Sequence, residues 1–108
     1  MNKLSLLGLS AAGLVALAGL ARAQDDPAAL AEAARCSACH HATDKRLGPS
    51  WAAVRDRYAA EEGAADTLKA RVRSGGSGVW GKAPMPPVPE GQLSDADLDA
   101  VLAWILEG

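Results

Sequence analysis

A Cys-x-x-Cys-His run contains the residues of this sequence whose types and spacing could do chemistry. Cys36, Cys39 and His40 form the run, and the two cysteines are the only two in the chain. Two thiols one helical turn apart can add to the two vinyl groups of one haem, and the following imidazole can then reach the iron. The run therefore predicts one haem c, covalently bound through Cys36 and Cys39, with His40 as an axial ligand of the iron.

Other chemistry is also open to two cysteines at this spacing. A thioredoxin-like redox disulfide expects a strand, helix and strand around it, whereas the segment before Cys36 is alanine-rich and helical in pattern. A structural zinc site needs four protein ligands, and beyond the run only His41 and scattered carboxylates remain. A plain disulfide would close too small a loop to constrain the unfolded chain much. The sequence context favours haem over each of these alternatives.

The N-terminal segment has the pattern of an export signal. Lys3 gives it a positive start, residues 4–20 are almost entirely apolar, and residues 21–23, Ala-Arg-Ala, match a small-x-small cleavage site. We therefore expect residues 1–23 to be a signal peptide, residues 24–108 to be one domain, and the protein to be periplasmic. Export agrees with the thiol pair, because haem attachment belongs on the oxidising side of the membrane. The alternative is an uncleaved anchor, since the apolar run is near the lower limit of a bilayer span.

The composition limits the kinds of fold and partner. A domain of this size is near the limit at which a hydrophobic core alone is marginal, and the chain has no Phe. A bulky apolar macrocycle would supply the missing core. Once residues 1–23 are removed, 9 of the 11 basic residues remain against 13 acidic ones, a net charge of −4. This balance argues against nucleic acid as a partner, which would call for a basic face.

Periodicity and turn signals predict an all-α fold with four helices. The first is expected over residues 28–35, after a cap at residues 25–27, and leads straight into Cys36. The second is capped by Ser50 and runs through about Tyr58. The third covers residues 65–73 and stops at a glycine-rich segment. The last is capped by Ser94 and has one apolar face, formed by Leu98, Val101, Leu102 and Ile105.

A proline-rich segment contains the candidate for the opposite face of the iron. Residues 81–92 hold four prolines, so they form neither a regular helix nor a central strand. Met85 lies among these prolines, which restrict the backbone that carries its thioether. Met1 leaves with the signal peptide, and His41 adjoins His40, so His41 cannot reach around the macrocycle and is expected to be an exposed loop residue. Met85 is therefore the predicted second axial ligand; otherwise it would fill a gap in the core.

Five motifs occur in a characteristic order. They are Cys36-Ser37-Ala38-Cys39-His40, Leu47-Gly48-Pro49, Ser77-Gly78-Val79-Trp80-Gly81, Pro84-Met85-Pro86-Pro87 and Leu102-Ala103-Trp104. In this order they resemble the small monohaem class I cytochromes c of bacteria, the short soluble type that feeds nitrite reductases and terminal oxidases. The resemblance covers nearly all of residues 24–108. It implies a cytochrome c domain with the class I fold, in which about four short helices and long loops wrap around one covalently attached haem.

The resemblance also implies roles for residues around the haem. The carbonyl of Pro49 would accept a hydrogen bond from the other ring nitrogen of His40 and so orient the imidazole. Trp80 and Arg71 match family residues that hydrogen-bond a haem propionate; the alternatives are core packing for Trp80 and a solvated helix face for Arg71. Related chains often have an asparagine after the two prolines that follow the methionine. Here Val88 and Pro89 follow, which leaves the reduction potential open.

The function implied by the resemblance is that of a one-electron carrier, not an enzyme. Its expected partners are periplasmic or membrane redox proteins, with a cytochrome bc1-type donor and a nitrite reductase or terminal oxidase as acceptor, and a monomer is expected. One alternative is a haem-based ligand-binding protein, such as a gas sensor or peroxidase-like enzyme, which would need an open iron site. Another is a subunit-type cytochrome domain of a larger oxidase or reductase complex.

Overall fold

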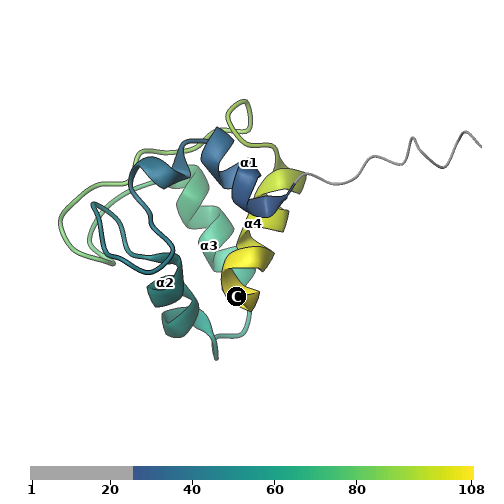
Figure 1. The fold of residues 1–108 in the computed structure, drawn as a ribbon. Coiled ribbons are helices and arrows are strands. Elements are labelled where there is room, and N and C mark those ends of the chain that lie inside the picture. Colours follow the sequence, from purple (N-terminus) through teal and green to yellow (C-terminus); the bar gives the residue numbers. More distant parts are fainter. Residues whose placement is uncertain (1–25) are drawn as a thin grey trace, which may run out of the picture.

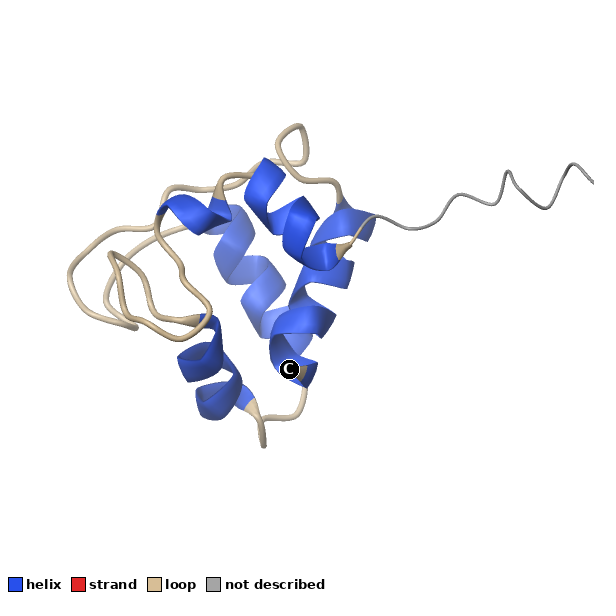
Figure 2. Cartoon of the chain, in the orientation of Figure 1, coloured by secondary structure: helices blue, strands red, loops and turns tan. Residues whose placement is uncertain are grey.

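The computed structural model describes residues 26–108, and helices are the regular structure within them. In chain order the elements are α1 (Pro27–Ala33), the short 3-10 helix η2 (Cys36–Ala38), α2 (Trp51–Tyr58), α3 (Ala64–Ser74) and α4 (Asp95–Glu107) (Figures 1 and 2). The predicted all-α fold with four helices is confirmed. The signal peptide predicted at residues 1–23 lies outside the described residues. Within residues 26–108, no helix is both long enough and apolar enough to cross a bilayer.

Local capping chemistry explains most of the helix boundaries. The side chain of Asp26 accepts from the first turn of α1, and Pro27 occupies the first helical position. The hydroxyls of Ser50 and Ser94 each accept the backbone N–H three residues ahead, at 3.0 Å in α2 and 3.2 Å in α4. Helix α3 ends at Ser74 and is followed by Gly75, whose φ of 67° favours glycine. The predicted caps and the glycine stop are therefore present.

The first helix differs from its prediction. Helix α1 ends at Ala33, and Arg35 has a left-handed φ of 70°, which breaks the helix before the cysteines. Gln92 donates from Nε2 to the free carbonyl of Ala34 at 2.8 Å, so a distant loop helps to cap the helix end. The expectation of a helix running straight into Cys36 was wrong. Residues 36–40 instead turn tightly, with the N–H groups of Cys39 and His40 both donating to the Cys36 carbonyl.

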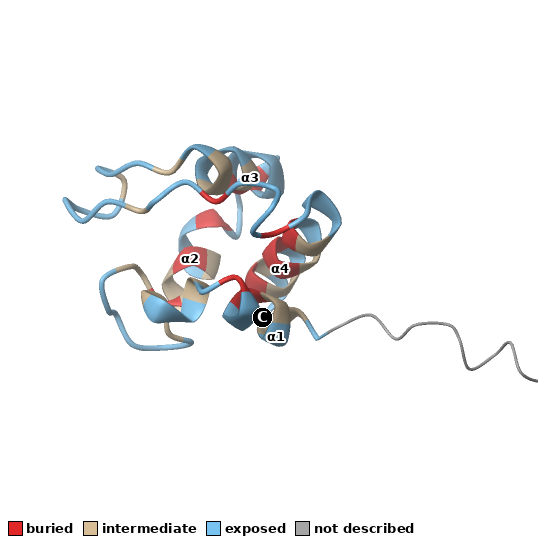
Figure 3. Ribbon diagram, turned by 90° about the horizontal axis from the view of Figure 1, so that it is seen from above, coloured by how far each residue is buried: buried red, intermediate tan, exposed pale blue. Residues whose placement is uncertain are grey.

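The core is organised around the last helix. Helices α1, α2 and α3 each pack against α4, and buried positions lie along α4 and on α2 (Figure 3). All four residues of the predicted apolar face are buried, and Leu98 is only 1% exposed. Ion pairs tie α3 to α4 at the surface, with Lys69 Nζ 2.9 Å from Asp99 and Arg73 Nη2 2.7 Å from Asp95.

The Arg73 hydrogen bond holds the pKa of the Asp95 carboxyl below its ordinary value. Because the pKa is lower in the folded chain than in the unfolded one, the ion pair is fully present at neutral pH. Its contribution to stability is lost as the pH falls through the lowered value.

Two long loops project from one side of the helices. One joins η2 to α2 and the other joins α3 to α4 (Figure 1), and in the view from above they stand apart from each other (Figure 3). The second loop is ordered by backbone bonds rather than by a strand pair. Gly76 and Met85 form an isolated antiparallel bridge, with N–H to carbonyl distances of 2.9 and 2.8 Å. As predicted, residues 81–92 form neither a regular helix nor a central strand, and the bridge to Gly76 makes them part of an ordered loop.

Candidate functional site

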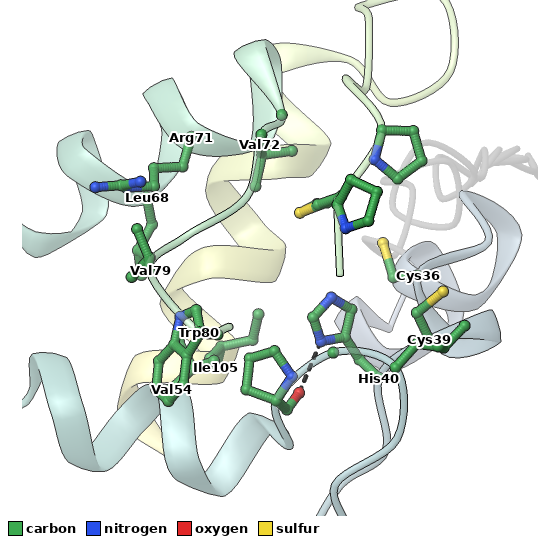
Figure 4. Close-up of a pocket in the computed structure, with 18 of the residues that line it drawn as sticks. Cys36, Cys39, His40, Val54, Leu68, Arg71, Val72, Val79, Trp80 and Ile105 are labelled. Carbon is green, nitrogen blue, oxygen red and sulfur yellow. Dashed lines mark hydrogen bonds between the residues drawn. The ribbon is translucent and has the colours of Figure 1, made fainter. Parts of the chain in front are cut away.

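A cavity of about 430 Å³ lies between the two loops and the helices. The η2 turn and the residues after it present Cys36, Cys39 and His40 to it (Figure 4). Met85, on the α3–α4 loop, also lines it. The inner wall consists of apolar side chains of the helices: Val54, Leu68, Val72, Leu98, Val101, Leu102 and Ile105. A covalent haem requires two thiols for attachment, an imidazole to bind its iron and an apolar slot for its ring. This cavity has all three. The residues present therefore fit the group that the sequence predicts.

Hydrogen bonding fixes the tautomer and the direction of the His40 ring. Its Nδ1 lies 2.7 Å from the Pro49 carbonyl (Figure 4). A carbonyl only accepts, so Nδ1 carries the proton and the lone pair of Nε2 is free to bind a metal. The indole of Trp51 stacks on the ring at 4.5 Å between centroids, with the planes 16° apart. The contact that the family resemblance implies for Pro49 is present.

A glycine makes room for this histidine. A Cβ on Gly48 would lie 2.6 Å from Cε1 and 2.9 Å from Nδ1 of His40, which is closer than real side chains approach. Gly48 is also held in place, because its N–H donates to the Cys39 carbonyl at 2.9 Å. The Leu-Gly-Pro motif therefore supplies both the space for the imidazole and the carbonyl that orients it.

A second glycine makes room for the methionine segment. A Cβ on Gly75 would lie 2.5 Å from the carbonyl oxygen of Met85 and 2.7 Å from the nitrogen of Pro87. These are backbone atoms, so they cannot rotate away as a side chain could. Met85 itself is half-buried and packs against the core.

Replacing Gly75 by alanine is expected to destabilise the fold by about 2 kcal/mol or more, because a φ of 67° with a ψ of −163° is a backbone conformation nearly confined to glycine and costs other residues roughly 1–3 kcal/mol before any clash is counted. It should also disturb Met85, which a spectrum of the haem-loaded protein would report. Gly63→Ala is the control for a glycine of positive φ without a close approach, since Gly63 lies in the left-handed region, at φ 75° and ψ 17°, with no atom within 4 Å of the added Cβ. Equal urea unfolding midpoints for the two variants would contradict the close approach at Met85.

Both cysteine thiols are free and half-buried at the cavity edge. Burial raises the pKa of the Cys36 thiol, partly offset by a backbone hydrogen bond. Figure 4 shows both sulfurs on the side of the cavity where η2 lies. The two groups predicted to bond to haem are therefore on the same wall as His40.

His41 has a different task from its neighbour. It does not line the cavity, and its Nδ1 accepts the backbone N–H groups of Thr43 and Asp44 at 3.1 and 2.9 Å. Its side chain is 39% exposed, so the expected exposed loop histidine is in fact half-exposed and shapes the turn after the cysteines. Nothing in the sequence pattern indicated this turn role.

The two residues implied as propionate contacts lie on the side of the cavity away from the cysteines (Figure 4). Arg71 is exposed on α3, and Trp80 is 38% exposed in the following loop. A residue that the sequence analysis missed, Arg57 of α2, stacks its guanidinium 4.8 Å from the Trp80 ring and donates to the Val79 carbonyl at 3.0 Å. The hydrogen bond from Arg57 to Val79 joins residues that are 22 positions apart in the chain. No local sequence pattern predicts a contact of this kind.

Comparison with known proteins defines the class. The cytochrome c family model matches residues 25–108, and the chain belongs to this family. It is 46% identical over 81 residues to cytochrome c2 of Rubrivivax gelatinosus, covering 75% of this chain and 95% of that one. It is 40% identical to cytochrome c-552 of Nitrosomonas europaea, covering 96% of each chain. The crystal structure of wild-type Nitrosomonas europaea cytochrome c552 superposes with a TM-score of 0.69 at 41% identity, covering 74% of this chain and 96% of that one.

The fold, the site and these relatives together identify a small class I monohaem cytochrome c. Haem c is bound covalently through Cys36 and Cys39, and the protein is an electron carrier that works with redox partner proteins rather than an enzyme. The predicted family, cofactor and electron-carrier character are confirmed. The roles of the individual side chains around the haem stay predictions.

Proposed function

We propose that this chain is a periplasmic cytochrome that carries single electrons between respiratory redox proteins, with the haem iron held between His40 Nε2 and Met85 Sδ. The observation that carries the proposal is the pairing of two independently fixed donors on one cavity. His40 is oriented by Pro49 on one loop, and Met85 is bridged to Gly76 on the other. Haem, when bound, supplies the one-electron couple of its iron.

The chain's own residues keep both donors in place. The Pro49 carbonyl accepts the Nδ1 proton of His40, which makes Nε2 a better donor and prevents ring rotation. Trp51 stacks on the same ring and restricts it from a second direction. On the other loop, the Met85 backbone has both its N–H and its carbonyl bonded to Gly76. Donors held this firmly change position little when the charge on the metal changes, which favours rapid electron transfer.

Arg71 and Trp80 are proposed to bind the haem propionates. An exposed guanidinium and an indole N–H are both donors suited to carboxylates. Both residues line the same cavity, and the stacking of Arg57 on Trp80 holds the indole near it. A cation beside a propionate would also offset part of its negative charge.

Location and partners complete the proposal. Residues 1–23 act as a signal peptide and residues 24–108 as the mature cytochrome c domain, exported to the periplasm. A cytochrome bc1-type complex supplies the electron and a nitrite reductase or terminal oxidase receives it. Such encounters use small, transient interfaces, which suits a monomeric carrier.

The visible spectrum of the protein, exported in a host that attaches haem, tests the proposed ligation. We expect a low-spin c-type spectrum in both oxidation states, with the weak far-red band of sulfur-to-iron charge transfer in the ferric form. High-spin haem without that band would mean an open iron and would favour a ligand-binding protein. Separation of soluble and membrane fractions tests the cleaved signal, since a retained anchor would place the haem protein in the membrane pool.

A further inference from the structure

A single arginine ties the segment that follows Met85 to helix α3. Arg73 lies in the last turn of α3, and its Nη1 donates to the carbonyls of Val88 at 2.9 Å and Leu93 at 2.8 Å. Its Nη2 donates to the carboxylate of Asp95, the first residue of α4, at 2.7 Å. The Arg73 side chain is 22% exposed, and its bonds to the two carbonyls are partly buried, whereas its bond to Asp95 lies at the surface. One guanidinium therefore holds both ends of residues 88–93 and the start of α4.

Val88 is the anchor of the methionine segment on its C-terminal side. It is 6% exposed, and its N–H donates to the Val72 carbonyl at 2.9 Å while its own carbonyl accepts from Arg73. The backbone N–H and the backbone carbonyl of this buried residue are thus both bonded to residues of α3. If Arg73 were absent, the carbonyls of Val88 and Leu93 would lose this donor at positions where the residues are buried.

Only two residues separate this anchor from the methionine. They are Pro86 and Pro87, whose fixed φ values make a stiff spacer. On the other side, the bridge to Gly76 fixes the Met85 backbone. A rigid spacer transmits displacement of one end to the other, so the position of the Met85 thioether depends on where Val88 is held.

The neighbouring cation of the same helix makes no such bonds. Lys69 lies one turn before Arg73 and pairs with Asp99 at 2.9 Å and with Asp95 at 3.8 Å. No hydrogen bond joins its side chain to residues 76–93 in the described structure. Lys69 therefore shares with Arg73 the charge and the link between α3 and α4, but not the contact with the methionine segment.

We propose that Arg73 is a positioning residue for Met85: by holding the Val88 and Leu93 carbonyls it limits how readily the thioether leaves the iron. The inference rests on the proposed His40 and Met85 ligation. It assigns to Arg73 a function in ligand retention in addition to its part in the fold. The planar fork of arginine reaches several acceptors at once, which a lysine ammonium does less well.

Titration of the ferric haem protein with imidazole tests this role, because imidazole binds the iron only where Met85 leaves it. Arg73→Ala is expected to raise the apparent imidazole affinity about tenfold, as the loss of charge-assisted bonds predicts. Arg73→Lys should show a smaller rise in imidazole affinity. It replaces Arg73→Ala in the test if the alanine variant does not fold. Lys69→Ala should stay within about twofold of the parent protein, since it removes ion pairs with two exposed carboxylates, Asp95 and Asp99, and no bond to the methionine segment. The far-red band reports displacement of the sulfur directly.

A second control separates ligand retention from general loosening. Ala31 is buried in α1 and does not line the cavity, so Ala31→Gly lowers stability without removing a hydrogen bond to the methionine segment. A rise in imidazole affinity in this variant equal to that in the Arg73 variants, at matched urea midpoints, would overturn the inference. So would Arg73 variants that behave like Lys69→Ala, and in that case the parent's far-red band would still support Met85 ligation. If the parent protein lacked the far-red band, both the proposed Met85 ligation and the inference about Arg73 would be wrong.

Discussion

Replacing Met85 by alanine is expected to abolish the far-red charge-transfer band of the ferric protein and to convert the haem from low spin towards high spin. Met85 is the thioether that lines the cavity, and alanine has no atom that can bind iron. A methionine ligand raises the reduction potential of haem iron. Its loss should therefore lower the potential by roughly a few tenths of a volt, which is a fraction of the roughly 0.8 V range that different axial ligands produce. Visible spectroscopy and a redox titration measure the two effects.

The rejected candidate, His41, provides the control for this prediction. Its imidazole is used by the turn after the cysteines, where it accepts two backbone N–H groups. His41→Ala should therefore keep the far-red band and alter only the stability of that turn. If the band survived in Met85→Ala or disappeared in His41→Ala, the proposed ligand pair would be wrong.

Replacing both Cys36 and Cys39 by serine is expected to leave a chain that does not fold stably. Without covalent haem, a cavity of about 430 Å³ between the two loops and the helices is left unfilled, and at ~24 cal/mol per Å³ it would cost up to about 10 kcal/mol. Small domains have only about 5–15 kcal/mol of stability in total. The cavity term alone can therefore remove most of the folding free energy.

Circular dichroism and urea unfolding check this expectation on the exported double variant. We expect reduced helix content and no cooperative transition, in contrast to the parent haem protein. Ser37→Ala, within the same turn but exposed, is the matched control and should retain haem and a normal transition. A double variant that unfolds cooperatively at the parent midpoint would show that the core does not depend on the macrocycle.

Local chemistry made much of this fold predictable from the sequence. Ser50 and Ser94 bond to N–H groups three residues ahead, and Gly75 ends α3 by its own backbone freedom. Such interactions need no knowledge of the rest of the chain. The Cys-x-x-Cys-His run likewise carries its chemistry in its spacing, so the cofactor and one wall of the cavity could be predicted directly.

The remaining features depend on contacts between distant segments. Arg35 breaks α1 in a left-handed conformation that glycine or asparagine usually adopts, so its sequence signal favoured a longer helix. Arg57 and Arg73 look like ordinary exposed helix residues until the loops are in place. The tight fit of Gly48 to His40 also exists only after folding. Sequence periodicity reports the helices but not what packs on their outer faces.

The order of the elements along the chain has a consequence for assembly. The cysteines lie near the start of the domain, in η2, whereas α4, against which the other helices pack, comes last. On the proposed export route, a chain that emerges N-terminus first presents its thiols before the wall that encloses the macrocycle has formed. Haem attachment can then occur while the segment that carries the cysteines is still accessible. Once α4 packs against the other helices, the attachment site is difficult to reach. If export proceeds as proposed, the order of the elements predicts that covalent attachment precedes the burial that protects the bond.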